Sequence, residues 1–167
     1  MGIFSWLFGG AGGVKQTPEQ IEADRVKNRR IDLVQRLKED HRFMLETWVG
    51  IGNDVDAGRH EAAVKGLAAF KDRLVPHVMM ENTYLYKGLE KDCSGEETSL
   101  MLIRDMHAEM DAIGKAVVAF TRKYMLLADD STLMVTFKKD YQEIQTILLD
   151  RIKREERDLY VLYKGLD

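Results

Sequence analysis

Proline is nearly absent from this chain, and this constrains the fold more than any other feature. Only Pro18 and Pro76 occur in 167 residues, and the long stretches around them are rich in Leu, Ala, Glu, Lys, Arg and Met. These residues favour α-helix, whereas proline removes a backbone donor and interrupts a helix. Apolar residues make up 45% of the chain, which is enough for the core of one domain. The sequence therefore predicts an all-α fold.

Cap and turn residues divide the chain into four long helices. Thr17-Pro18-Glu19-Gln20 is a capping box with proline at the first helical position, and it predicts a helix over residues 18–55. A second helix is expected over 59–89, with a kink at Pro76. Ser94-Gly95-Glu96-Glu97 is a second capping box and predicts the start of a third helix, to about residue 127.

The fourth helix is expected after the turn Asp129-Asp130-Ser131, and Gly165 should end it near residue 163. Short connections between long helices make neighbouring helices antiparallel. The predicted fold is therefore an antiparallel up-down-up-down four-helix bundle over residues 17–167. Residues 1–16 form a separate apolar and glycine-rich tail. The run MGIFSWLFGG is too short to span a bilayer, so residues 1–10 form either a flexible tail or a small anchor for a membrane surface or a protein partner.

Polar side chains interrupt the apolar seam of each predicted helix. A bundle buries a stripe whose residues recur in steps of three and four. In the second helix this stripe runs through Leu74, His77, Glu81 and Leu85, so His77 and Glu81 should point inward. The corresponding positions elsewhere are His41 in the first helix, His107 with Asp111 at its border in the third, and Arg151 with Glu155 in the fourth. The inward polar residues of two consecutive helices lie at similar distances along the chain from the turn that connects those helices. We therefore expect these residues to form one polar layer in the core.

Two interpretations of this layer are open. Burying charge costs several kcal/mol unless the charge is paired or bound to a metal. Histidine together with Asp and Glu suits iron, manganese or zinc, and bundles build such sites from facing helices. The alternative is a metal-free network in which Arg151 pairs with Glu81, Glu155 or Asp111 and fixes the register of the helices.

Four segments carry a resemblance to a known family. EDHRF (39–43), HVMMENTYLY (77–86), MHAEMD (106–111) and RIKREERDLY (151–160) resemble the hemerythrin-like, or HHE cation-binding, domains over roughly residues 31–163. The resemblance implies a four-helix bundle with a non-haem di-iron centre. Family members bind dioxygen or serve in oxygen or redox sensing, iron handling or iron–sulfur repair. The implied metal ligands are His41, His77, Glu81, His107, Asp111 and Glu155, with Glu81 and Glu155 as candidates to bridge two ions.

Arg151 departs from the family pattern, which has a histidine at this place on the fourth helix. A guanidinium stays protonated and is not a metal ligand. Aligning YKGL at 86–89 with its repeat at 163–166 instead sets Arg154 and Asp158 opposite His77 and Glu81, and this alignment also lacks a histidine. We therefore predict one or two iron ions, with Arg151 tuning or blocking the second site.

Composition narrows the function further. The net charge is −3 without a basic stripe, which excludes nucleic acid as the expected partner. Cys93 is the only cysteine, which favours a reducing cytoplasm. We expect a cytoplasmic iron-binding protein, membrane-associated if its N-terminus is an anchor, that senses or carries dioxygen or a related molecule. A binding function is favoured over catalysis. The sequence leaves open whether the protein forms a homo-oligomer.

Two alternatives belong to other classes. One is a degenerate, metal-free helical bundle that acts as a protein-interaction regulator. The chain resembles bacterial sigma-factor-binding regulators, which are helical bundles of similar length. Some of these also carry an arginine followed by paired acidic residues on a late helix. The other is a redox enzyme at the same centre, which turnover of peroxide or nitric oxide would reveal.

Overall fold

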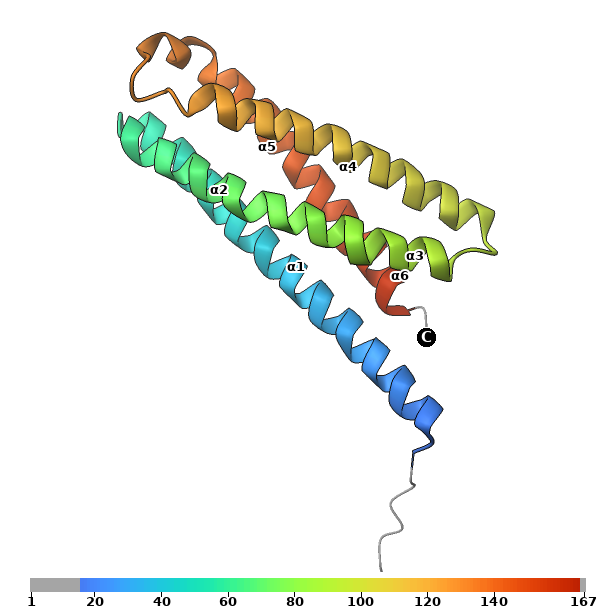
Figure 1. Ribbon diagram of the computed structural model, residues 1–167. Helices are drawn as coiled ribbons and strands as arrows, with labels where there is room; N and C mark the ends of the chain where they lie inside the picture. Colours follow the sequence, from blue (N-terminus) through green and yellow to red (C-terminus); the bar gives the residue numbers. More distant parts are fainter. Residues whose placement is uncertain (1–15, 166–167) are drawn as a thin grey trace, which may run out of the picture.

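The computed structural model describes residues 16–165 as an antiparallel four-helix bundle, which confirms the predicted fold (Figure 1). Residues 1–15, which hold most of the expected apolar tail, lie outside the described residues, so the anchor stays a prediction. Within residues 16–165, no helix is both long and apolar enough to cross a lipid bilayer. In chain order the elements are α1 (Pro18–Asp56), α2 (His60–Met80), the π-helical η1 (Glu81–Tyr86), α3 (Lys87–Asp92), α4 (Glu97–Tyr124), the 3-10 turn η2 (Ser131–Leu133), α5 (Met134–Arg154), the π-helical η3 (Glu155–Leu159) and α6 (Tyr160–Gly165).

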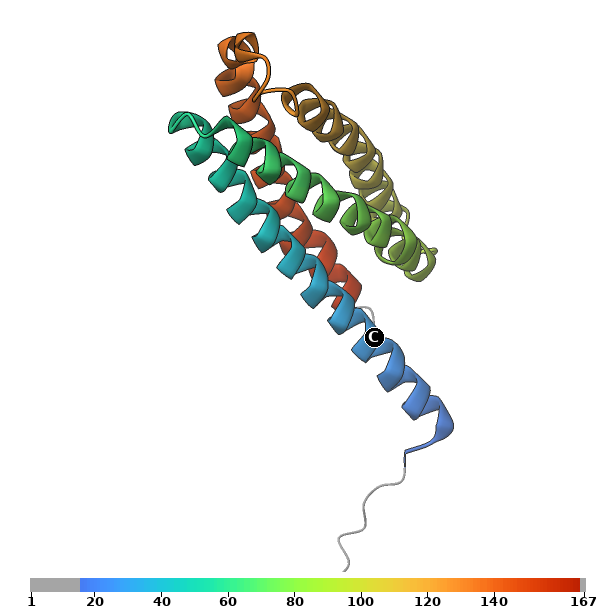
Figure 2. The ribbon, with the colours of Figure 1, turned by 60° about the vertical axis from the view of Figure 1, so that its left-hand side comes forward.

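The first predicted capping box is confirmed at the start of α1. Thr17 Oγ1 accepts a hydrogen bond from the Gln20 amide (3.2 Å), and Gln20 Oε1 accepts one from the Thr17 amide (2.8 Å). Residues 16–29 are all exposed, and the first turns of α1 extend past the end of the bundle (Figures 1 and 2). The capping box thus starts a helix that enters the core only after Arg30.

The second predicted capping box is wrong. The N-cap of α4 is Glu96, and no side chain caps that position. The amide of Glu96 donates to the carbonyl of Cys93 (2.9 Å), and the backbone of Glu96 is not helical. Because a turn occupies residues 93–96, Ser94 lies too early to cap the helix.

The second and fourth helical stretches each contain a π-helical segment. The predicted helix over residues 59–89 is one run of α2, η1 and α3, and Pro76 lies inside α2. Each π segment begins at a buried glutamate, Glu81 in η1 and Glu155 in η3. Such π turns are rare and often mark functional sites.

Two apolar clusters fill the bundle, and a polar layer separates them. The first cluster lies toward the α1–α2 turn and includes Trp48, Phe70 and Phe120. The second lies toward the α3–α4 turn and includes Leu37 and Leu85. The buried polar residues between them are Asp40, His41, His77, Glu81, Arg151 and Glu155. The predicted inward layer is therefore present at the level of the two π segments, with contributions from three of the four expected helices.

Candidate metal centre

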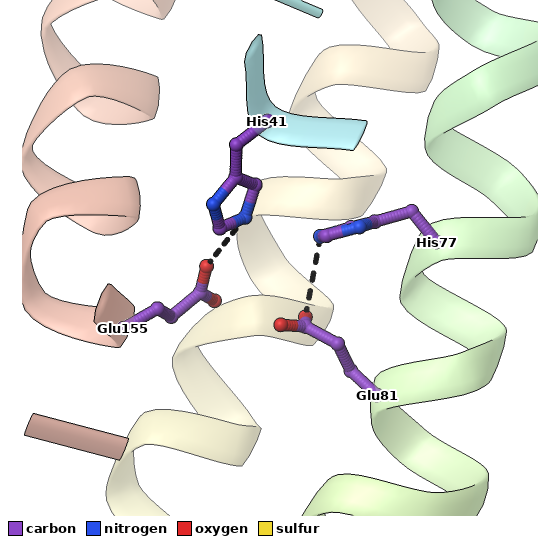
Figure 3. Close-up of side chains that lie close together, drawn as sticks. All are labelled: His41, His77, Glu81 and Glu155. Atoms are coloured by element: carbon purple, nitrogen blue, oxygen red, sulfur yellow. Dashed lines mark ion pairs between the residues drawn. The ribbon is translucent and has the colours of Figure 1, made fainter. Parts of the chain in front are cut away.

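Two histidines and two glutamates meet inside the bundle (Figure 3). His41 comes from α1, His77 from α2, Glu81 from η1 and Glu155 from η3. Their exposed fractions are 2%, 1%, 0% and 1%. One ligand atom from each residue lies within 4.8 Å of every other such atom. His41 Nε2 lies 3.2 Å from Glu155 Oε2, and His77 Nε2 lies 3.8 Å from Glu81 Oε2.

Each of these histidines has a second carboxylate behind it. His41 Nδ1 lies 3.0 Å from Glu156 Oε1, and His77 Nδ1 lies 3.5 Å from Asp40 Oδ2. A carboxylate beside Nδ1 is an arrangement that orients metal-binding histidines, although Nδ1 of His77 makes no hydrogen bond among the described residues. Nε2 of each histidine faces the interior of the cluster, where Nε2 of His41 also lies 3.3 Å from the Tyr160 hydroxyl.

The interior of the cluster has an unsatisfied acceptor. Glu81 Oε1 accepts a hydrogen bond from the Tyr160 hydroxyl (2.9 Å), but Glu81 Oε2 has no hydrogen-bond partner among the described residues. A buried carboxylate oxygen without a partner costs free energy. A cation held between Glu81, Glu155 and the two histidines would remove this cost. Nitrogen and carboxylate donors together suit iron, manganese or zinc, so the residues fit one metal ion.

Burial and nearby charges shift the pKa values of the two glutamates in opposite directions. Burial, reinforced by the charge of Glu155, raises the pKa of Glu81 well above its usual range. Burial also opposes ionisation of Glu155, but the hydrogen bond with His41 and the charge of Arg151 hold its pKa below the usual range. Burial lowers the pKa of His77, although Asp40 opposes the shift. A metal ion would therefore bind with release of protons from the cluster.

Arg151 is buried beside this cluster, as predicted. Its Nε donates to Glu155 Oε1 (2.5 Å), its Nη1 donates to the carbonyl of Met106 (2.9 Å), and its Nη2 donates to the Tyr86 hydroxyl. The alternative alignment through Arg154 and Asp158 is not the one that the structure adopts. Arg154 is partly exposed, and its guanidinium pairs with Glu109 and Asp150 at the surface.

A repeated pattern links the two halves of the site. Glu-x-x-x-Leu-Tyr occurs at residues 81–86 and again at 155–160, and each copy begins a π segment. The tyrosine that ends each copy reaches the opposite helix. Tyr86 accepts from Arg151, and Tyr160 donates to the glutamate that begins the first copy. The two tyrosines thereby connect the two helical stretches across the polar layer.

The structure does not bring His107 and Asp111 into the cluster. His107 is half-buried, and its ring stacks on that of Tyr86 with centroids 4.3 Å apart. Asp111 is exposed, so the expectation that it borders the buried seam is wrong. The reason is that the seam of α4 follows larger apolar side chains one position away. Its buried residues are Ile103, Met106, Met110, Ile113, Val117, Phe120, Thr121 and Tyr124.

Sequence analysis missed three acidic residues of the surroundings. Asp40 is buried, lies 3.2 Å from Arg73 and faces His77. Glu156 contacts His41, and Glu109 forms ion pairs with both Arg151 and Arg154. One of the three had a signal, since Asp40 lies three residues after a seam leucine and four before a seam methionine.

Comparison with known proteins gives one match. The model of the hemerythrin HHE cation binding domain matches residues 32–163, which span the polar layer and both apolar clusters. No curated protein and no solved structure matches the chain.

Proposed function

Because the chain belongs to the hemerythrin HHE cation-binding domain family, we propose that its buried cluster binds one non-haem iron ion. The ligands would be His41, His77, Glu81 and Glu155. The observation that carries the proposal is the buried Oε2 of Glu81, which accepts no hydrogen bond from the described residues and lies within reach of the other three donors. His107 and Asp111, although expected as ligands, are left out because they lie outside this group.

One ion, not two, is proposed because of Arg151. Its guanidinium lies against Glu155 and is held by a backbone carbonyl and by Tyr86. The fixed positive charge repels a second cation and takes up one oxygen of the carboxylate that would have to bridge two ions. The site is therefore proposed as mononuclear.

Iron with histidine and carboxylate ligands can supply open coordination positions and one-electron chemistry. The cavity beside the cluster has a volume of about 20 Å³, which is room for about one small molecule. Such a space has about the size that a water or diatomic molecule needs. We therefore propose that the protein senses or carries dioxygen or a related small molecule.

The direct test is metal content. Protein purified from iron-supplemented cells should carry about one iron per chain by elemental analysis. His77→Ala should lose it, whereas His60→Ala, at the start of α2 and outside the cluster, should keep it. An unchanged metal content in His77→Ala would exclude the proposed site.

A metal-free interaction regulator is the second candidate, and one observation favours it. Arg151 and His41 both pair with Glu155, so side chains of the protein can satisfy this buried carboxylate. If this function holds, the purified protein should contain no metal and should unfold at the same temperature with and without chelator. A pull-down would then be expected to recover a protein partner.

A further inference from the structure

The four side chains of the cluster are buried, so a molecule that reaches them must pass between other side chains. The small cavity beside it is bounded by His41, His77, Arg151 and Glu155 on its polar side. The rest of its lining is apolar. This lining comprises Met44, Leu45, Phe70, Leu74, Met110, Ile113, Leu148 and Ile152.

Two surface grooves share wall residues with this cavity. A groove of about 670 Å³ between α2 and α4 shares Leu74 and Met110, both buried. These helices lie side by side in both views of the bundle (Figures 1 and 2). A second groove, between α1 and the stretch of α5 and η3, shares Leu45 and Ile152.

The chemistry of the two grooves differs. The α2–α4 groove is lined mainly by apolar side chains, among them Val75, Val78 and Val118, with Asp111, Lys115, Arg122 and Lys123 also on its walls. The second groove is lined by charged side chains from Lys38, Asp150, Lys153, Glu156 and Arg157. An uncharged diatomic molecule partitions into an apolar groove, whereas an ion loses its hydration there. On the inner wall, Met110 is unbranched and has three rotatable bonds, so it can move aside more easily than a branched side chain.

Gly114 has no side chain that could cover Met110 on the side of the α2–α4 groove. It lies inside α4, where glycine costs about 1 kcal/mol relative to alanine. A Cβ added there would meet nothing within 4 Å, so packing does not require the glycine. Gly52 and Gly66 differ, because a Cβ at either would meet a neighbouring side chain at 2.7 Å. A helical side chain covers the turn before it, which for position 114 is the turn of Met110.

We propose that the α2–α4 groove is the access route for small uncharged molecules to the His/Glu cluster, with Leu74 and Met110 as its inner wall and Gly114 keeping that wall exposed. This proposal rests on the proposed function, since it names the route to the same centre. It assigns a selective role to residues that do not touch the metal.

The first test uses the iron-loaded protein and nitric oxide as the probe. Gly114→Leu should slow nitric oxide association with the ferrous protein several-fold in stopped-flow mixing, because leucine covers Met110. The matched control is Gly50→Leu, a second helical glycine at which a Cβ meets nothing within 4 Å and which does not line this groove. It should associate at the wild-type rate. Both variants should remain folded, because each replaces a helical glycine in open space.

The second test needs no metal and therefore separates this proposal from the proposed function. In a Trp6→Phe background, Trp48 is the only tryptophan, and its ring lies 5.0 Å from that of Phe70, which lines the cavity. Quenching of Trp48 fluorescence by dissolved dioxygen should weaken in Gly114→Leu and strengthen in Met110→Ala. If neither variant changes quenching, the route is overturned, even if nitric oxide association slows. If quenching responds but no iron binds, the route stands and the proposed function fails.

Discussion

Arg151 donates a 2.5 Å hydrogen bond from Nε to Oε1 of Glu155, one turn further along the same helical stretch, and both side chains are buried. A buried ion pair is tolerated only when its remaining polar atoms are also satisfied. Here the carbonyl of Met106 and the hydroxyl of Tyr86 accept from the guanidinium. The arginine is therefore held firmly at the place where a second ligand set would be needed.

Replacing Arg151 should restore a second metal site. Arg151→His removes the fixed charge and adds a neutral nitrogen donor one turn before Glu155. We expect the iron content to rise from about one to about two ions per chain by elemental analysis. Arg154→His is the matched control, since Arg154 is partly exposed and pairs with Glu109 outside the cluster. A content that stays near one in Arg151→His would contradict the blocking role.

Glu81→Gln should have opposite effects on the metal-free and the loaded protein. In the metal-free protein it replaces a buried carboxyl group, one oxygen of which has no hydrogen-bond partner within residues 16–165, so the free energy of unfolding should rise by about 1–3 kcal/mol. The same change removes a proposed ligand, so added ferrous iron should no longer stabilise the protein. Denaturant unfolding with and without iron measures both effects. Glu143→Gln, at an exposed position of α5, should change neither.

The stability of the far end of the bundle should depend on pH through Asp140. Hydrogen bonds from Lys123 and Tyr124, each 2.7 Å, hold the pKa of Asp140 below its usual value of 3.8. A carboxyl group with a lowered pKa in the folded state stabilises the fold above its unfolded-state pKa, and this contribution is lost as the pH falls through the folded-state value. Asp140→Asn should therefore cost about 1 kcal/mol at neutral pH.

This cost of Asp140→Asn should shrink as the pH falls below 3.8, because the wild-type carboxyl then becomes protonated as well. Urea unfolding at several pH values follows the difference. Asp105→Asn, at an exposed position of α4, serves as the control and should show no such trend. A cost for Asp140→Asn that is the same at all pH values would indicate lost packing instead of lost ionic bonding.

Three of the four seams could be predicted from sequence because large apolar residues flank the polar ones at unambiguous spacing. On α4 two stripes compete. One passes through His107 and Gly114, and the other passes through Met106 and Ile113 one position earlier. The second buries more apolar surface and is the one that packs inward. The sequence pattern alone does not rank them, since both share the same flanking residues.

The π segments at Glu81 and Glu155 could not be predicted from sequence. A π turn depends on hydrogen bonds that only the packed bundle selects, such as those of Tyr86 with Arg151 and of Tyr160 with Glu81. The acidic residues behind the histidines were missed for a related reason. Glu156 reaches His41 from another helix, and residue spacing within one helix carries no information about such a contact.

Two glycines two residues apart in α1 should respond to alanine with opposite signs. A Cβ at Gly50 meets nothing within 4 Å, so Gly50→Ala should stabilise the protein by about 1 kcal/mol through helix propensity. A Cβ at Gly52 meets Tyr141 Oη at 2.7 Å and Cζ at 2.9 Å. Tyr141 cannot easily move away, because its ring stacks on Trp48 and its hydroxyl donates to the Trp48 carbonyl (2.8 Å).

Gly52→Ala should therefore destabilise the protein by about 1–3 kcal/mol, despite the same gain in helix propensity. Thermal unfolding of the two variants beside wild type measures both signs. The double variant Gly52→Ala with Tyr141→Leu removes the clash, so in that background the alanine should cost much less. Equal stabilisation by both single alanine variants would mean that the tyrosine does not hold its position against α1.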